Sequence, residues 1–127
     1  MVAGDPNGQQ RSYLVSEEGF AFVKRLEQNN LIVPIVGNFA GPRALRLVGE
    51  YLAEKSETVS VFYLSNVEEY LRRDGTLKTF CANAAALPID DTSLSIRSVR
   101  GDAPDAGFRL TSELGALAAE LRACDQN

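Results

Sequence analysis

The sequence alternates between two hydrophobic patterns, and this alternation most constrains the fold that the chain can adopt. Short apolar runs of the kind found in strands are separated by longer segments whose apolar residues recur every three or four positions, as in helices. In chain order, the patterns predict a helix at 17–28, a strand at 31–37, a helix at 42–55, a strand at 58–65, a broken helix at 66–72 and 76–87, a strand at 93–99 and a helix at 112–123.

Strands that are separated by helices favour right-handed crossover connections and a parallel sheet. The first run, LIVPIVG at 31–37, is apolar throughout, which is typical of a strand covered on both faces. Pro34 within it cannot donate to a sheet ladder, which favours an edge position or a local bulge. We therefore expect an α/β fold, namely a small three-layer Rossmann-like domain with a parallel sheet of about three strands flanked by helices.

The length of the chain and its composition favour one domain. With 127 residues, 45% of them hydrophobic and 24% charged, the chain can bury one core. Residues 1–10 are rich in glycine, proline, asparagine and glutamine, so that we expect 1–15 to be a mobile N-terminal arm and lead-in. Residues 16–127 are expected to form a single α/β domain, with a linker of glycine, proline and aspartate at 101–107.

The charge of the chain argues against two classes of partner. A net charge of -4 provides no field that attracts nucleic acid or an anionic membrane. The sequence has no run of about 18 apolar residues, and its first ten residues are polar. We therefore expect a cytoplasmic protein whose partners are neither nucleic acids nor membranes.

The chain contains no histidine, and this restricts its chemistry. Histidine-activated nucleophiles and ordinary zinc sites are excluded. Asp90 and Asp91 form the densest acidic pair, which we interpret as a solvated turn, with a magnesium site as the alternative. Cys81 and Cys124 lie outside any CxxC motif and suit a reducing compartment better than a disulfide. We predict no catalytic residue and no metal ligand.

In a parallel sheet, ligands bind where the strands end, and the first such corner is expected at 37–43. Gly37 and Gly41 would let a ligand approach the backbone, and Arg43 in the first turn of the next helix would add a donor fork for an anion. We favour the interpretation in which the glycines only make a tight turn and Arg43 is solvated, and keep the anion site as the alternative.

The second corner is expected at 64–68, where a strand changes to a helix. Ser65 and Glu68 have the S-x-x-E spacing of a capping box, in which each side chain accepts from the backbone amide of the other residue. Capping does not need Asn66, whose amide would point toward the crevice at the strand ends. Phe39 or Tyr63 could stack on a flat ring, although such residues more often belong to the core.

Three segments, LIVPIVGNFAGPRALRLVGEYL, VFYLSNVEEYL and FCANAAALPIDDTSLSIRSV, resemble the carboxyl-terminal half of a family of uncharacterised bacterial proteins. The similarity covers residues 11–100. Longer members of this family carry an upstream glycine-rich strand and loop similar to that of S-adenosylmethionine-dependent methyltransferases, and this loop has no counterpart in the segments quoted. The resemblance implies a Rossmann-like architecture and assigns no catalytic residue.

Two functional classes remain open. The first is a non-catalytic or accessory Rossmann-like module that forms a homo-oligomer or docks on a protein partner. The second is a methyltransferase-like cofactor or nucleotide-binding domain, for which the resemblance implies S-adenosylmethionine. We do not expect catalysis by the chain alone, and any activity would be methyltransferase-like. The binding residues predicted for the second class are Gly37, Asn38, Phe39, Gly41, Arg43, Tyr63, Ser65 and Asn66.

Overall fold

Two units make up the chain in the computed structural model, Met1–Ile35 and Val36–Asn127. The structure describes residues 7–10, 12–100 and 110–124. Part of the expected N-terminal arm, 1–6 and 11, and the expected linker at 101–107 lie outside the described residues. The predicted domain boundary between residues 15 and 16 stays a prediction.

The first unit contains one helix, α1 (Glu17–Gln28), whose bounds agree with those predicted. The helix begins where the Ser16 hydroxyl accepts a hydrogen bond from the Gly19 amide at 3.1 Å, and two glutamates in its first turn suit the helix dipole. It ends before Asn30, which adopts a left-handed backbone with φ of 54°. No residue of α1 is buried within the structure.

The apolar run at 31–37 is not a strand, and the prediction that it forms one is wrong. Its large side chains are exposed, Val36 completely. An apolar, β-branched composition favours a half-buried pleated surface but does not supply a neighbouring strand with which to pair. Pro34 also removes one of the amide donors that such pairing would use.

The second unit contains a sheet of three strands, β1 (Val61–Ser65), β2 (Leu94–Arg100) and β3 (Leu110–Ala116), in the order β1-β2-β3. Strand β1 is parallel to β2, whereas β2 and β3 are antiparallel. The sheet is therefore mixed, and the prediction of a parallel sheet is wrong for β3, part of which was expected to begin a helix at 112. Only nine residues separate β2 from β3, which is too few for a parallel crossover of a dozen residues or more.

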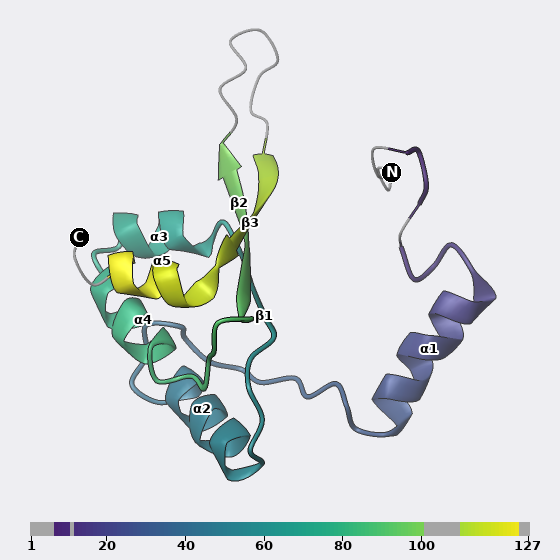
Figure 1. Ribbon diagram of the computed structural model, residues 1–127, viewed down its shortest axis with the longest axis horizontal. Coiled ribbons are helices and arrows are strands. Elements are labelled where there is room, and N and C mark those ends of the chain that lie inside the picture. Colours follow the sequence, from purple (N-terminus) through teal and green to yellow (C-terminus); the bar gives the residue numbers. More distant parts are fainter. Residues whose placement is uncertain (1–6, 11, 101–109, 125–127) are drawn as a thin grey trace, which may run out of the picture. The chain divides into compact units, whose positions relative to one another are not determined.

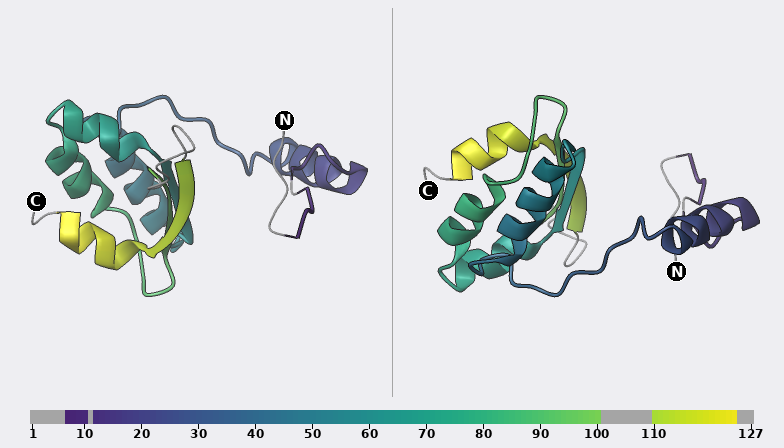
Figure 2. Two further views of the ribbon diagram at one scale, coloured as in Figure 1. Left: turned by 90° about the horizontal axis from the view of Figure 1, so that it is seen from above. Right: turned by 90° about the horizontal axis from the view of Figure 1, so that it is seen from below.

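The described residues of the second unit form four helices, α2 (Ala44–Glu54), α3 (Val67–Arg73), α4 (Leu77–Ala84) and α5 (Leu117–Cys124). Figures 1 and 2 show all four on the same face of the sheet. The unit thus has two layers, in contrast to the three-layer arrangement that we expected, and a Rossmann-like topology is not found. The predicted break between α3 and α4 is confirmed, because Gly75 takes a left-handed backbone with φ of 69° there.

The core of the second unit lies between the helices and the sheet. Phe80 of α4 is fully buried, and its ring meets those of Phe39 and Phe62 at centroid distances of 6.1 and 6.4 Å. Such tilted and edge-to-face contacts are favourable for aromatic rings. The remaining buried members of the core are Leu45, Leu64, Leu71, Cys81, Ala84, Leu117 and Leu121.

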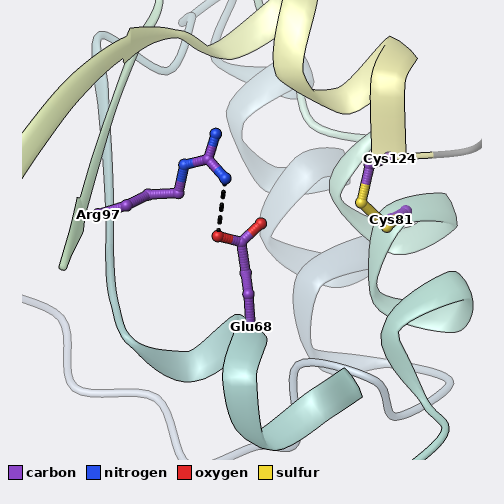
Figure 3. Close-up of a disulfide and its surroundings, with 4 residues drawn as sticks. All are labelled: Glu68, Cys81, Arg97 and Cys124. Carbon is purple, nitrogen blue, oxygen red and sulfur yellow. Dashed lines mark hydrogen bonds and ion pairs between the residues drawn. A yellow bond between two sulfur atoms is a disulfide. The ribbon is translucent and has the colours of Figure 1, made fainter. Parts of the chain in front are cut away.

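A disulfide joins Cys81 of α4 to Cys124 of α5 across this core, with a Cα–Cα distance of 5.9 Å (Figure 3). The prediction of two reduced cysteines is therefore wrong. The two residues are 43 positions apart, and their pairing follows from the packing of α5 against α4. No short sequence motif predicts this packing. Persistent disulfides are rare in the reducing cytoplasm, so this bond is at odds with the cytoplasmic location expected from the sequence. In the part of the chain that is described, no helix is both long and apolar enough to cross a membrane.

We expect Phe80→Ala to lower the free energy of unfolding by about 3–5 kcal/mol, because it removes a fully buried ring and leaves a cavity between its aromatic neighbours. Urea denaturation monitored by circular dichroism measures the change. Phe22→Ala is the matched control, since the ring of Phe22 on α1 is 53% exposed and its removal should change stability by less than about 0.5 kcal/mol. Equal losses for the two variants would contradict the assignment of the core.

Candidate functional site

The first predicted corner is a tight turn that leads into α2. The Asn38 side-chain oxygen accepts from the Ala40 amide at 2.9 Å, and the Asn38 carbonyl accepts from the Gly41 amide at the same distance. A Cβ atom at Gly37 would overlap the side chain of Ala44, so glycine is required there for packing. Arg43 is exposed and caps nothing with its side chain. These contacts agree with the tight turn that the sequence favours over an anion site.

Asn83 of α4 fastens this turn to the core, and sequence reasoning missed it. Its side-chain amide is buried and donates to the carbonyls of Phe39, at 3.0 Å, and Gly41, at 2.8 Å. Its oxygen accepts from the side chain of Arg46 at 3.0 Å. A buried amide with three partners is a strong structural anchor. The available signal was a polar residue within the apolar stretch FCANAA.

The second predicted corner turns through the backbone of Ser65, which has a left-handed φ of 51°. The pairing register of β1 with β2 shifts between Tyr63 and Ser65, just before this turn. Asn66 then occupies the cap position of α3, but its side chain makes no capping hydrogen bond. The predicted capping box is wrong, because the carboxylate of Glu68 accepts instead from Arg97 at 3.0 Å.

The two predicted corners are connected by a contact between two aromatic rings. The ring of Phe39 lies 6.3 Å from the ring of Phe62 on β1, so the first turn packs beside this strand. Because 31–37 is not a strand, however, Gly37 does not lie at the end of a strand as expected. Tyr63 points away from the ring cluster, since successive residues of a strand face opposite sides of a sheet. The predicted role of these residues in cofactor binding stays a prediction.

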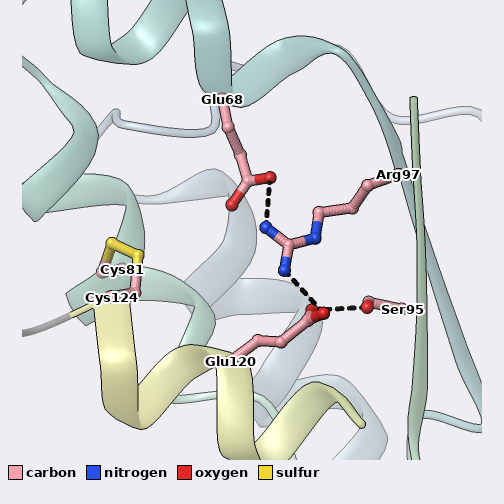
Figure 4. Close-up of polar contacts among 6 residues, drawn as sticks. All are labelled: Glu68, Cys81, Ser95, Arg97, Glu120 and Cys124. Atoms are coloured by element: carbon pink, nitrogen blue, oxygen red, sulfur yellow. Dashed lines mark hydrogen bonds and ion pairs between the residues drawn. A yellow bond between two sulfur atoms is a disulfide. The ribbon is translucent and has the colours of Figure 1, made fainter. Parts of the chain in front are cut away.

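Arg97 on β2 forms the centre of a polar cluster on the helix-covered face of the sheet (Figure 4). Its guanidinium donates to Glu68 of α3 at 3.0 Å and to Glu120 of α5 at 2.5 Å. The buried hydroxyl of Ser95 donates to the second oxygen of Glu120. Partial burial disfavours the charged guanidinium, but the hydrogen bonds and negative charges of Glu120 and Glu68 outweigh it and raise the pKa of Arg97.

Gly115 makes room for this cluster. It lies opposite Ser95 in the β2–β3 ladder, and a Cβ atom at this position would overlap the carboxylate of Glu120. The cluster therefore joins β2, α3 and α5 through groups that satisfy one another, which is the arrangement of a structural brace. Within the described residues, no buried side-chain polar atom lacks a partner and no acidic or cysteine group is arranged to hold a metal ion.

Asp90 and Asp91 lie in the turn before β2. The carboxylate of Asp90 accepts from the backbone amide of Thr92 at 2.8 Å and from the Thr92 hydroxyl at 2.7 Å. These hydrogen bonds, and weaker ones from Ser93, lower the pKa of Asp90. The contacts agree with the solvated turn that the sequence favours.

The opposite face of the sheet, which we call the outer face, is a surface that the sequence did not single out. Side chains alternate across a strand, so the inward direction of Ser95 and Arg97 turns Leu94 and Ile96 outward. No helix of the second unit covers this face (Figure 2). Its described members, taken from the register of the three strands, are Val61, Tyr63, Leu94, Ile96, Ser98, Ser112, Leu114 and Ala116.

The outer face is apolar and carries no charge among these members. Tyr63 is 62% exposed, Leu114 66% and Val61 50%. A sheet with one covered face ordinarily buries its apolar side chains and presents polar ones to water. In β2 the order is reversed, because a serine and an arginine face the helices. This reversal makes the outer face the candidate binding surface of the chain.

We predict that Asn83→Ala lowers the free energy of unfolding by about 2 kcal/mol, since it leaves two carbonyls of the first turn without their buried donor. Thermal and urea denaturation measure the loss. Asn29→Ala is the control, because its side chain bonds only the exposed carbonyl of Arg25, and it should cost no more than about 0.5–1 kcal/mol. If Asn83→Ala lowers the free energy of unfolding by no more than the control does, Asn83 does not anchor the turn to the core.

A second prediction concerns the brace. Arg97→Met should destabilise the protein by about 2 kcal/mol, because Glu68 and Glu120 would lose their shared cation while still half-buried. Arg72→Met on the exposed side of α3 removes the same charge and should stay within about 0.5 kcal/mol of the unaltered protein. Chemical denaturation of both variants at one ionic strength tests the difference.

Comparison with known proteins defines the family of the chain without assigning an activity. None of the curated proteins matches it. A family model described as a domain of unknown function, DUF7790, matches residues 1–116. This agrees with the resemblance to an uncharacterised family, whereas nothing in the match connects the chain to methyltransferases. The mixed α/β chain with its braced sheet therefore belongs to the DUF7790 family.

Proposed function

We propose that this chain is a binding module that self-associates, and that a second copy covers the outer face of its sheet. The observation that carries the proposal is the exposure of Tyr63 and Leu114 on a face whose described members are mostly apolar and uncharged and beside which no helix of the second unit lies. Contiguous apolar surface of this kind marks an interaction site more often than it marks ordinary surface.

The absence of charge on this face favours a second copy as the occupant. The chain carries a net charge of -4, so two copies repel each other wherever their acidic surfaces meet. The described members of the outer face include no acidic or basic side chain, so two such faces can meet without opposing like charges. Among these described members, a strongly charged partner would find no complementary group.

Packing of two such faces has a known geometry. Sheets that pack face to face lie about 10 Å apart, with their side chains interdigitating, and a twofold axis makes the same patch serve on both copies. Tyr63 and Leu114 lie on opposite sides of Ile96, since Tyr63 and Ile96 are partners in one ladder and Ile96 and Leu114 in the next. Together they form an apolar row across all three strands, which would lie at the centre of the interface.

The methyltransferase-like alternative has less support. Phe39, one of the two rings that could stack on a cofactor, contacts Phe62 and Phe80 in the core. Gly37 and Gly41 are explained by the tight turn and its packing. Both observations assign structural roles to residues that a cofactor site would need, and we therefore retain the self-associating module as the proposal.

The test is the oligomeric state of the protein and of two single variants. Size-exclusion chromatography with light scattering should show a dimer for the unaltered protein at micromolar concentration, and Tyr63→Asp should shift it to monomer, since a carboxylate would be buried at the centre of the interface. Tyr51→Asp on α2 is the matched control, because Tyr51 is 56% exposed but lies on a helix, and it should leave the dimer intact.

Circular dichroism should show that both variants stay folded. A monomer at all concentrations of the unaltered protein would refute self-association. A dimer that Tyr63→Asp leaves intact would refute the outer face as the interface.

A further inference from the structure

A groove runs between α4 and α5 on the side of the second unit away from the outer face. One wall is formed by α4 and the residue after it, the other by α5, and the turn before β2 closes one part of it. The residues that line the groove include Cys81, Ala85 and Ile89 on one side and Ala118, Leu121 and Arg122 on the other. The Cys81–Cys124 disulfide ties its two walls together (Figure 3).

The two ends of α5 are held in different ways. At its start, α5 continues directly from β3, the side chain of Leu117 is buried, and its amide donates to the Ser93 carbonyl at 3.0 Å. In the middle, Glu120 bonds Arg97 and Ser95. In the last turn the covalent tether is Cys124, a half-buried residue, assisted by the packing of Leu121.

We propose that the Cys81–Cys124 disulfide is a redox latch of this groove: its reduction releases the last turn of α5 from α4 and widens the groove, while the rest of the unit stays folded. The opening is local because the brace and the buried start of α5 do not depend on the disulfide. Regions held by few contacts open more readily than the core to which they are attached.

The chemistry of the latch needs an external dithiol. One thiolate of the reductant attacks a sulfur of the disulfide and forms a mixed disulfide, and the second thiol of the reductant then displaces the remaining protein sulfur. The S–S bond is broken, Cys81 and Cys124 each gain one electron and one proton, and the reductant leaves as its own disulfide. Cys124 is the more accessible of the two sulfurs, because Cys81 is only 2% exposed.

Hydrogen–deuterium exchange of the full chain, oxidised and reduced with dithiothreitol, tests the proposal. Reduction should raise the exchange rates of the amides at 121–124 by about tenfold or more and those of α2 by less than about twofold. Reoxidation should restore the original rates. The double variant C81S/C124S should show the reduced pattern with and without dithiothreitol; if it fails to fold, the reduced unaltered protein decides the question.

Glu120→Gln is the matched control, since it weakens the polar tether of α5 and keeps the disulfide. It should leave the amides at 121–124 closer to the oxidised than to the reduced rates. Unchanged exchange on reduction would overturn the latch, as would a loss of protection throughout the second unit, which would make the disulfide a staple of the whole unit. An equal rise in the exchange rates of the amides at 121–124 in oxidised Glu120→Gln would also overturn it, because the disulfide would then not be what restrains the last turn of α5. These readouts do not depend on the oligomeric state.

Discussion

The arrangement of the second unit depends on the ion pairs that the side chain of Arg97 forms on the helix-covered face of the sheet. A guanidinium can bind two carboxylates at once because its N–H donors form a planar fork, and here the carboxylates come from Glu68 of α3 and Glu120 of α5. Both helices are thereby held on the same face of β2. Because side chains alternate along a strand, an inward Arg97 obliges the apolar neighbours Leu94 and Ile96 to face outward. The polar brace and the apolar outer face are thus two results of one register.

The register of the strands also determines which side chains lie on the outer face. A unit with a single helix layer leaves one face of its sheet uncovered. Such a face is stable in water without a partner when its side chains are polar. Among the residues predicted to bind a ligand, Tyr63 is the one that lies on this face, although the sequence placed it at a cofactor pocket. Arg43 and Asn66 occupy the N-cap positions of α2 and α3, and neither side chain makes a capping hydrogen bond there. The apolar outer face follows from the register of the strands, which no short motif encodes.

Local signals in the sequence were sufficient for features that local contacts determine. The helix at 17–28 has its cap and its left-handed end within the same stretch of chain. Strands, in contrast, depend on pairing with distant segments. The prediction of a strand at 31–37 is wrong because this run has no neighbouring strand. The prediction of a helix at 112–116 is wrong because these residues pair with β2. The capping box failed for the same reason, because Glu68 bonds Arg97, 29 residues further along the chain, rather than the amide beside it.

Strand β1 has a feature that affects how the protein behaves in a crowded solution. In the described part of the chain it pairs on one side, with β2, and the amides and carbonyls along its other side face away from the sheet. The strand has five residues, and the left-handed backbone of Ser65 ends it abruptly. An open edge of this length presents too short a template for a foreign strand to extend the ladder by many hydrogen bonds. The bend at Ser65 therefore limits how far another strand could pair along this edge.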